Sequence, residues 1–164
     1  MRLKVSHEKE INSSVENLWD LISLREHLNL VHPFCKINEA IEWNQKAHKD
    51  VLVYLNGLRY FREFKTWKEK KGYTLIIGTK RGKKSEVSWQ INSENKKTFL
   101  KISVKPYLFV NLPSPLYKVM FYVIVKPMLT KYLKSVLGGI DWYMTYKKPV
   151  PKNYFGKHIW FSNY

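Results

Sequence analysis

The spacing of apolar and polar side chains changes period along the chain and so predicts its elements. Apolar and polar residues alternate over residues 3–11, which predicts a first β-strand. Ser14 and Glu16 then supply an N-cap and an acidic first turn for a helix. A second short helix over residues 25–31 must end before Pro33, because proline disfavours helical backbone in the residue ahead of it.

From residue 36 the period becomes two, which predicts a run of strands. Between them lie polar turns rich in glycine or charge, and Asn56-Gly57 is a strong signal for a tight hairpin. These features predict an antiparallel meander of about six strands, with the first strand completing the sheet. The predicted strands cover residues 36–44, 50–56, 56–67, 72–79, 85–92 and 98–105.

After residue 106 the pattern changes again, to a proline-rich loop and then a long helix over residues 115–146. Pro127 should bend this helix, and the pair Gly138-Gly139 should weaken it. Residues 149–164 form a tail rich in proline and aromatic side chains. The apolar positions at the start of the helix are spaced as one helical face, namely Leu116, Val119, Met120, Val123 and Ile124.

Composition points to one folded domain in a reducing compartment. The chain has 164 residues, of which 45% are hydrophobic and 15% aromatic, enough for a core without a disulfide or metal. Cys35 is the single cysteine, so no internal disulfide can form. No secretory signal opens the sequence, and the apolar run 119–125 is far shorter than the ~20 residues of a transmembrane helix. We therefore expect a soluble, cytoplasmic protein.

The charge is strongly basic and uneven. The formal net charge is +16, and the excess lies in residues 51–164, where 22 basic and five acidic residues sum to +17. Such a field favours an anionic partner such as an acidic membrane surface, although a simple solvated lysine surface also fits. Of the 29 basic residues only five are arginines, and this scarcity argues against a nucleic-acid partner.

The motifs of common catalytic and cofactor sites are missing from the sequence. The five histidines show no metal-ligand spacing, and there is neither a GxSxG elbow nor a glycine-rich phosphate loop. Acidic residues are too scarce to propose paired carboxylates. We therefore expect no metal, no cofactor and no catalytic residue.

The order of elements resembles that of the START-like, or SRPBCC, superfamily, which includes the Bet v 1 allergens. Four short stretches carry the local resemblance: His32-Pro33-Phe34-Cys35, NGLRYFREF at 56–64, GYTLIIG at 72–78 and VSWQI at 87–91. They are similar to a polyketide cyclase/dehydrase-like subgroup. The resemblance implies an α+β helix-grip fold, in which a curved antiparallel sheet of about seven strands wraps around the long C-terminal helix and two short helices follow strand one. The predicted domain spans residues 1–148, with 149–164 as an aromatic, basic tail.

In this fold the sheet and the helix enclose a cavity, and the resemblance implies binding of a small hydrophobic or amphipathic molecule there, such as a lipid or polyketide-like compound. The alternatives are a cyclase- or aromatase-like enzyme in the same cavity and a peripheral lipid carrier on anionic membranes. An aromatic tail interspersed with Lys152 and Lys157 fits such a membrane role, or else it packs back on the domain. The predicted ligand-binding residues are His32, Phe34, Trp43, Tyr54, Tyr60, Arg62, Trp89, Tyr107 and Met120.

Arg62 poses the sharpest question, because it shares the inward strand face with Tyr60 and Phe64. A buried guanidinium needs a partner. Glu39, in register with Ile37, Ile41 and Trp43 on a face taken as inward, is one candidate, and snorkelling at the sheet's end is another. Alternatively, Arg62 anchors a ligand carboxylate, phosphate or carbonyl. His32 likewise is either a structural hydrogen bonder or a ligand contact.

Overall fold

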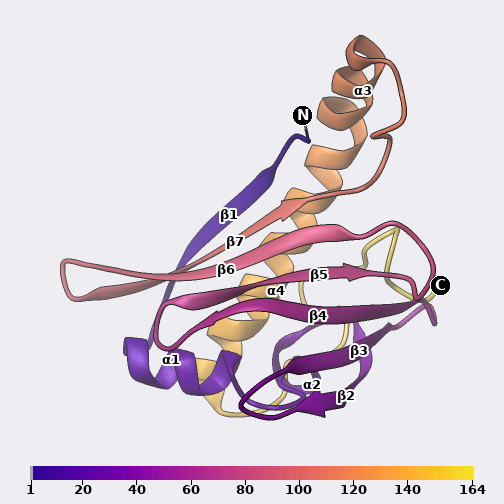
Figure 1. Cartoon of the computed structure of the whole chain (residues 1–164). Coiled ribbons are helices and arrows are strands. Elements are labelled where there is room, and N and C mark those ends of the chain that lie inside the picture. Colours follow the sequence, from indigo (N-terminus) through magenta and orange to yellow (C-terminus); the bar gives the residue numbers. More distant parts are fainter. Residues whose placement is uncertain (1) are drawn as a thin grey trace.

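Seven antiparallel strands form one curved sheet that wraps around a long C-terminal helix in the computed structural model, which describes residues 2–164 (Figure 1). The strand order is β1-β7-β6-β5-β4-β3-β2, so β1 and β2 form the two edges. The strands are β1 (Val5–Ile11), β2 (Cys35–Trp43), β3 (His48–Tyr54), β4 (Arg59–Lys68), β5 (Gly72–Gly78), β6 (Ser85–Glu94) and β7 (Lys97–Lys105). The helical segments are α1 (Val15–Ile22), α2 (Leu28–Val31), α3 (Ser114–Met120), η1 (Phe121–Val125) and α4 (Lys126–Tyr146).

The fold class predicted from the sequence is confirmed. Strands β2 to β7 follow one another as a meander, and β1 pairs with β7 at the far edge. Helix α1 begins as its sequence predicts, because the Ser14 hydroxyl accepts a hydrogen bond from the Asn17 backbone N–H. Helices α1 and α2 connect the two edge strands, and their buried apolar faces contribute Leu18, Trp19, Leu21, Ile22, Leu28 and Val31 to the core.

Strand β2 corrects the sequence prediction of its faces. Ile37, Glu39 and Ile41 are exposed, whereas Asn38 is buried. Two irregularities in its pairing with β3 explain the difference, one before Ile37 and one between Ala40 and Glu42. Each irregularity adds a residue that breaks the period-two alternation, so one face cannot be followed from end to end.

The C-terminal helix is continuous from residue 114 to residue 146, but it changes width ahead of Pro127. Residues 121–125 form a π-helical segment, in which the Lys126 N–H bonds to the Phe121 carbonyl five residues earlier. A proline ring clashes with the carbonyl four residues before it, and the wider turn relieves that clash. Gly139 has a packing role as well, because a Cβ there would lie 2.0 Å from the Val31 carbonyl oxygen. Helix α4 can therefore approach α2 closely.

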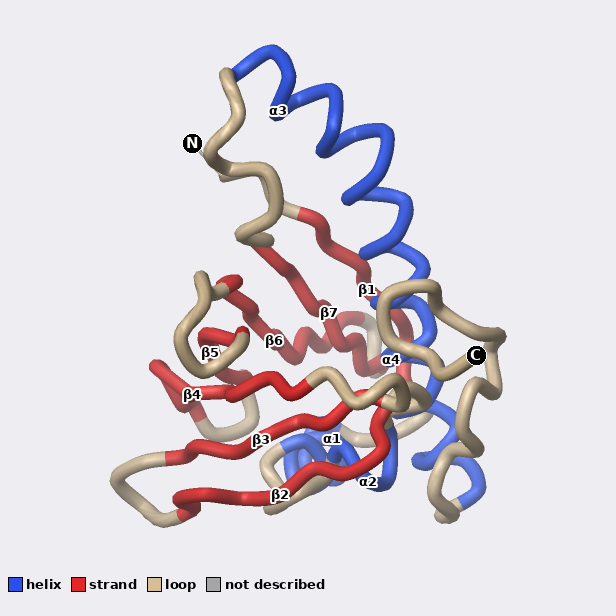
Figure 2. The backbone as a smooth tube through the Cα atoms, turned by 90° about the vertical axis from the view of Figure 1, so that its right-hand side faces the viewer, coloured by secondary structure: helices blue, strands red, loops and turns tan. Residues whose placement is uncertain are grey.

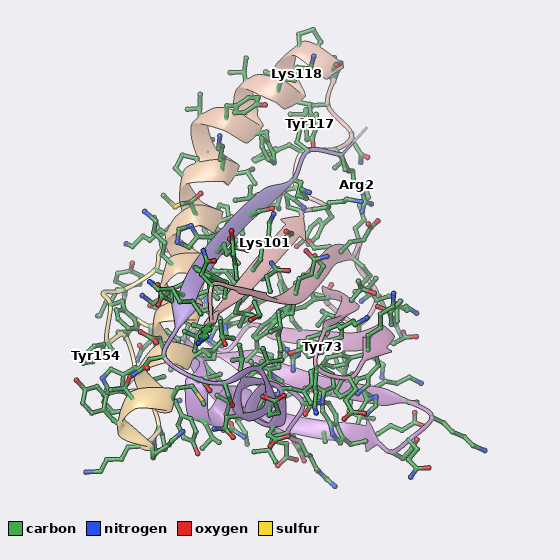
Figure 3. The ribbon with its side chains drawn as sticks, turned by 90° about the vertical axis from the view of Figure 1, so that its left-hand side faces the viewer. Arg2, Tyr73, Lys101, Tyr117, Lys118 and Tyr154 are labelled. Carbon is green, nitrogen blue, oxygen red and sulfur yellow. The ribbon has the colours of Figure 1, made fainter. Side chains whose placement is uncertain are left out.

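The start of this helix projects beyond the sheet (Figures 1 and 3). The helical face formed by Leu116, Val119 and Val123 is exposed there. Tyr117, Phe121 and Val125 form the buried side instead. Val119 and Val123 are 56% and 68% exposed, and Leu116, Tyr122 and Ile124 are exposed as well. The apolar spacing is thus helical, as predicted, but the side that it marks is exposed and does not face the core.

The tail folds back over the domain beside α4 (Figure 2). Backbone hydrogen bonds join Val150 to Leu30, Asn153 to Pro33 and Asn56 to Phe161. Phe161 is buried, and with Trp160 it reaches the interior between sheet and helix. No helix in residues 2–164 is long and apolar enough to cross a membrane.

Candidate functional site

An apolar cavity of about 100 Å³ lies between the inner face of the sheet and α4. Strands β3 to β7 supply one wall, α4 supplies the other, and Trp160 and Phe161 of the tail contribute to the lining. Typical ligand pockets measure roughly 300–1,000 Å³, whereas an engineered cavity of about 150 Å³ binds benzene. This cavity is smaller than the one that holds benzene, so even an occupant of one ring requires small movements of its walls, and a larger ligand requires larger movements.

Six of the nine residues predicted from the sequence line this cavity: His32, Tyr54, Tyr60, Arg62, Trp89 and Tyr107. The other three lie outside its lining. Phe34 is fully buried behind the wall, against the rings of Tyr132 and His158. Trp43 belongs to an aromatic cluster near the other end of β2, and Met120 ends α3 in the projecting part of the helix.

Sequence reasoning missed Tyr132, Ser85, Trp160 and Phe161, which also line the cavity. The sequence pattern could have identified Tyr132 as a residue on the same helical face as Leu129 and Val136, because it follows Leu129 by three residues and precedes Val136 by four. The tail gave no comparable signal, since its aromatic residues follow no period.

Arg62 finds its partner on the neighbouring strand, and that partner is Asp50, not Glu39. The two residues are directly opposite in the β3–β4 pairing. The Nε and Nη2 atoms of Arg62 donate to the two carboxylate oxygens of Asp50, at 2.7 and 2.6 Å. Both side chains are at least 97% buried. Glu39 is exposed and points to the other face of the sheet.

This pair is ionised. Burial raises the pKa of the Asp50 carboxyl, but the charge and hydrogen bonds of Arg62 outweigh burial and hold the pKa below its usual value. For Arg62, burial opposes the charge, but the Asp50 carboxylate raises its pKa still further. The guanidinium also lies 5.2 Å from the centre of the Phe64 ring. Two opposite charges thus cancel inside the cavity wall.

A chain of neutral hydrogen bonders runs beside the pair. The Phe34 N–H donates to Nδ1 of His32, so the proton of the neutral ring is on Nε2 and is donated to the Tyr132 hydroxyl oxygen at 2.8 Å. The Tyr132 hydroxyl contacts that of Tyr54 at 3.1 Å. A second pair, Tyr60 and Tyr107, is joined at 3.1 Å between hydroxyl oxygens.

These groups do not titrate near neutral pH. Burial, and then the charge of Arg62, lowers the pKa of His32 to about 3. Burial raises the pKa of Tyr132 to about 12 and those of Tyr54 and Tyr60 further above the usual tyrosine value. At neutral pH the imidazole is therefore uncharged and the phenols keep their protons, so the site presents hydrogen-bond donors.

The remaining titratable side chains do not assemble a metal or nucleophile site. Within residues 2–164, no group of three or more His, Cys, Asp or Glu side chains is placed to hold a metal ion. His27 is fully buried, with Nδ1–H donated to the Leu24 carbonyl and Nε2 without a protein partner, but it does not line the cavity. Cys35 is buried, which raises the pKa of its thiol to about 11 and makes it a poor nucleophile.

No protein-family model matches the chain, and no curated protein matches it significantly. Solved structures do. TTHA0849 from Thermus thermophilus is 14% identical, with a TM-score of 0.70 over 87% of this chain and 97% of its own. A START superfamily protein from Mycobacterium smegmatis is 15% identical, with a TM-score of 0.66 over 87% of this chain and 97% of its own.

DynU16, described as a putative protein in the dynemicin biosynthetic locus, is 12% identical with a TM-score of 0.66. The match covers 89% of this chain but 48% of DynU16, so the chain spans about half the length of that protein. At these identities the likeness shows the fold alone. The chain has the START-like helix-grip fold that its sequence predicts.

Proposed function

We propose that the protein binds one small apolar or amphipathic molecule in the cavity between the sheet and α4. The observation that carries this proposal is the convergence of polar side chains on a largely apolar cavity. Arg62, His32 and Tyr54 are buried there, and Tyr60, Tyr107 and Tyr132 are partly buried. Ligand sites combine these two features, because apolar walls supply the affinity and a few polar groups fix the orientation. A core with no binding role would be more stable without them.

Filling the cavity tests this proposal. The variant Leu129→Trp adds a large side chain to the lining, whereas Ile41→Trp adds the same side chain at an exposed position of β2. Native mass spectrometry of protein purified from its own host should show a co-purifying organic molecule on wild type and Ile41→Trp, and none on Leu129→Trp. Equal loading of both variants would place the molecule elsewhere and refute the proposal.

The cyclase- or dehydratase-like alternative has less support. Such chemistry begins with proton abstraction, which needs a base with a pKa near the working pH. Burial leaves His32 a weak base with a pKa of about 3, and the raised pKa values of Tyr54, Tyr60 and Tyr132 keep these side chains protonated. Membership of a polyketide cyclase/dehydrase-like subgroup therefore stays a prediction from the sequence.

A second candidate function is docking on an anionic membrane, favoured by the apolar tip that we define as Leu116, Val119, Tyr122, Val123 and Ile124. The residues of this tip are exposed. They belong to the projecting end of the helix, where Figure 3 labels Tyr117 and Lys118. Exposed apolar surface of this kind marks contact with a membrane or another protein. Tail residues Trp160 and Phe161, by contrast, face the cavity and are not free for a membrane.

The charge around the tip favours acidic lipid over a second copy of the chain. Residues 95–140 contain eight lysines and no acidic residue. Lys126, Lys131 and Lys134 line a surface groove together with Tyr122, so cationic side chains adjoin the tip. Two copies that each carry +16 would repel, whereas anionic headgroups would attract these lysines.

The docking prediction is that wild-type protein co-sediments with phosphatidylcholine vesicles containing phosphatidylserine and that added salt releases it. A charge at Val119→Asp or Val123→Asp should lower the bound-to-free ratio by about tenfold or more, because an aspartate in the acyl region is costly. Both sites are exposed, so the variants should fold.

The matched control is Ile41→Asp, which places the same charge at an exposed residue of β2 and should bind as wild type does. Ile159→Asp reports on the tail in the same assay, since Ile159 is 67% exposed. Equal binding to vesicles of phosphatidylcholine alone would refute the anionic surface. A wild-type dimer that Val123→Asp dissociates, with no vesicle binding, would assign the tip to self-association instead.

A further inference from the structure

The polar groups of the cavity also indicate the chemical class of its ligand. We infer that the cavity selects uncharged molecules bearing a carbonyl or similar acceptor oxygen, and that it rejects carboxylates and phosphates. This inference rests on the proposed binding function and narrows it. Two independent features carry it, the number of hydrogen-bond donors and the balance of charge.

The first feature is a set of donor protons that form no hydrogen bond among the residues of the cavity wall. His32, Tyr132 and Tyr54 bring three N–H or O–H protons to their chain, but only two hydrogen bonds join the three residues. Tyr60 and Tyr107 bring two protons to one bond. Whichever way each hydroxyl turns, one proton in each group has no acceptor among them. The rings of Tyr54 and Tyr60 are 5.5 Å apart, so the two groups adjoin.

Arg62 adds a third donor. Asp50 takes up Nε and Nη2, whereas Nη1 has no hydrogen-bond partner within residues 2–164. Arg62 is only 3% exposed. Even so, Nη1 keeps some accessible surface, because in residues 2–164 the one fully enclosed side-chain N or O atom without a hydrogen bond is Nε2 of His27. Arg62 lines the cavity, and together with Asp50 and Phe61 it also lines a surface groove. In our inference the free edge of Arg62 faces the cavity. A ligand there then meets several donors, and an acceptor oxygen satisfies them best.

The second feature is the charge balance, which decides between the kinds of acceptor. Arg62 and Asp50 cancel, and the neighbouring His32 is uncharged. A buried carboxylate or phosphate would bring an additional negative charge without a counter-charge, and its desolvation would be uncompensated. A ketone, ester or amide oxygen accepts the same hydrogen bonds without that cost.

The positive field of the protein does not reverse this conclusion. The net charge of +16 attracts anions to the surface, but water and salt screen that attraction over about 10 Å. Desolvation, in contrast, acts in full inside an apolar cavity. Anions should therefore collect on the outside of the protein, and the cavity should take up neutral molecules.

Three one-ring probes of similar shape test the inference: acetophenone, benzoate and ethylbenzene. Amide chemical shifts of the cavity residues, followed by NMR at neutral pH, give each affinity. Acetophenone should bind roughly tenfold more tightly than ethylbenzene, which lacks an acceptor, and by at least that factor more tightly than benzoate. Tyr60→Phe should weaken acetophenone roughly threefold to tenfold and leave ethylbenzene unchanged.

Tyr73→Phe is the matched control, because its hydroxyl is buried on the Ile22 carbonyl and does not line the cavity. It should leave both affinities as in wild type. Benzoate binding as tightly as acetophenone would overturn the charge argument, and ethylbenzene binding equally would overturn the donor argument. If none of the three probes shifts a cavity amide, the proposed binding function itself fails.

Discussion

Replacing Asp50 with alanine should lower the free energy of unfolding by about 3–5 kcal/mol, because it leaves the charge of Arg62 buried and unpaired. The two side chains are at least 97% buried and joined by two short hydrogen bonds. Urea denaturation, followed by tryptophan fluorescence, measures the change as a shift of midpoint at constant slope. A loss this large would measure the cost of one buried charge left without its partner, and not the net contribution of the pair to stability.

Glu63→Ala is the control, at a position next to Arg62 in the neighbouring strand β4. Glu63 pairs with Lys65 at 2.6 Å, as closely as Asp50 pairs with Arg62, but both side chains of this pair are nearly half exposed. Exposed pairs contribute about 0–1 kcal/mol, so this variant should unfold close to wild type. If Asp50→Ala is no more destabilising than Glu63→Ala, then water reaches the Arg62 site and the description of it as buried is wrong.

The double variant Asp50→Leu/Arg62→Met separates the structural role of the pair from its role in binding. Apolar replacements of a buried ion pair are often neutral or stabilising, so much of the stability lost in Asp50→Ala should return. A pair that serves only the fold would leave the preference for acetophenone over ethylbenzene unchanged. We expect the preference to weaken, because the free edge of the guanidinium is gone.

The sequence showed that Arg62 needs a partner, but it did not identify that partner as Asp50. Asn56-Gly57 indicated a hairpin between β3 and β4, and a hairpin does connect them, with Gly57 at a φ of 88°. A two-residue turn at that pair would place residues 50 and 63 opposite each other. The observed pairing is shifted by one residue, so that Asp50 lies opposite Arg62. Loop length sets this register, and a dipeptide signal does not determine loop length.

The orientation of the C-terminal helix is the second feature that the sequence could not predict. Periodicity identified the helix from residue 114 onward, but both of its sides are apolar in the projecting part, and spacing alone cannot show which side faces the core. In the structure the side that carries Tyr117 faces inward, and the Tyr117 hydroxyl accepts a hydrogen bond from the Leu3 N–H. That contact joins residues 114 positions apart in the sequence, and local pattern carries no information about it.

Acid should destabilise the protein well above the pH at which carboxylates titrate. Burial, and then the charge of Arg62, lowers the pKa of both His27 and His32 from 6.5 to about 3 in the folded chain. Between those values the unfolded chain binds protons that the folded chain refuses, so stability is full above pH 6.5 and falls as pH drops toward 3. Two such groups should cost about 3 kcal/mol per pH unit near pH 5.

Urea midpoints measured from about pH 7 to about pH 4.5 give this slope, and His27→Asn should lower it by about one proton. His158 is also buried, which lowers its pKa and adds to the slope of both proteins. Asparagine keeps an N–H near the position of Nδ1 for the Leu24 carbonyl but cannot take up a proton in this range. His7→Asn is the control. Burial lowers the pKa of His7 as well, but this side chain is only partly buried, so its replacement should change the slope less than His27→Asn does. An unchanged wild-type midpoint down to about pH 5 would mean that His27 and His32 accept protons without unfolding. The neutral hydrogen-bond chain through His32 and Tyr132, and the selectivity inferred from it, would then be wrong at that pH.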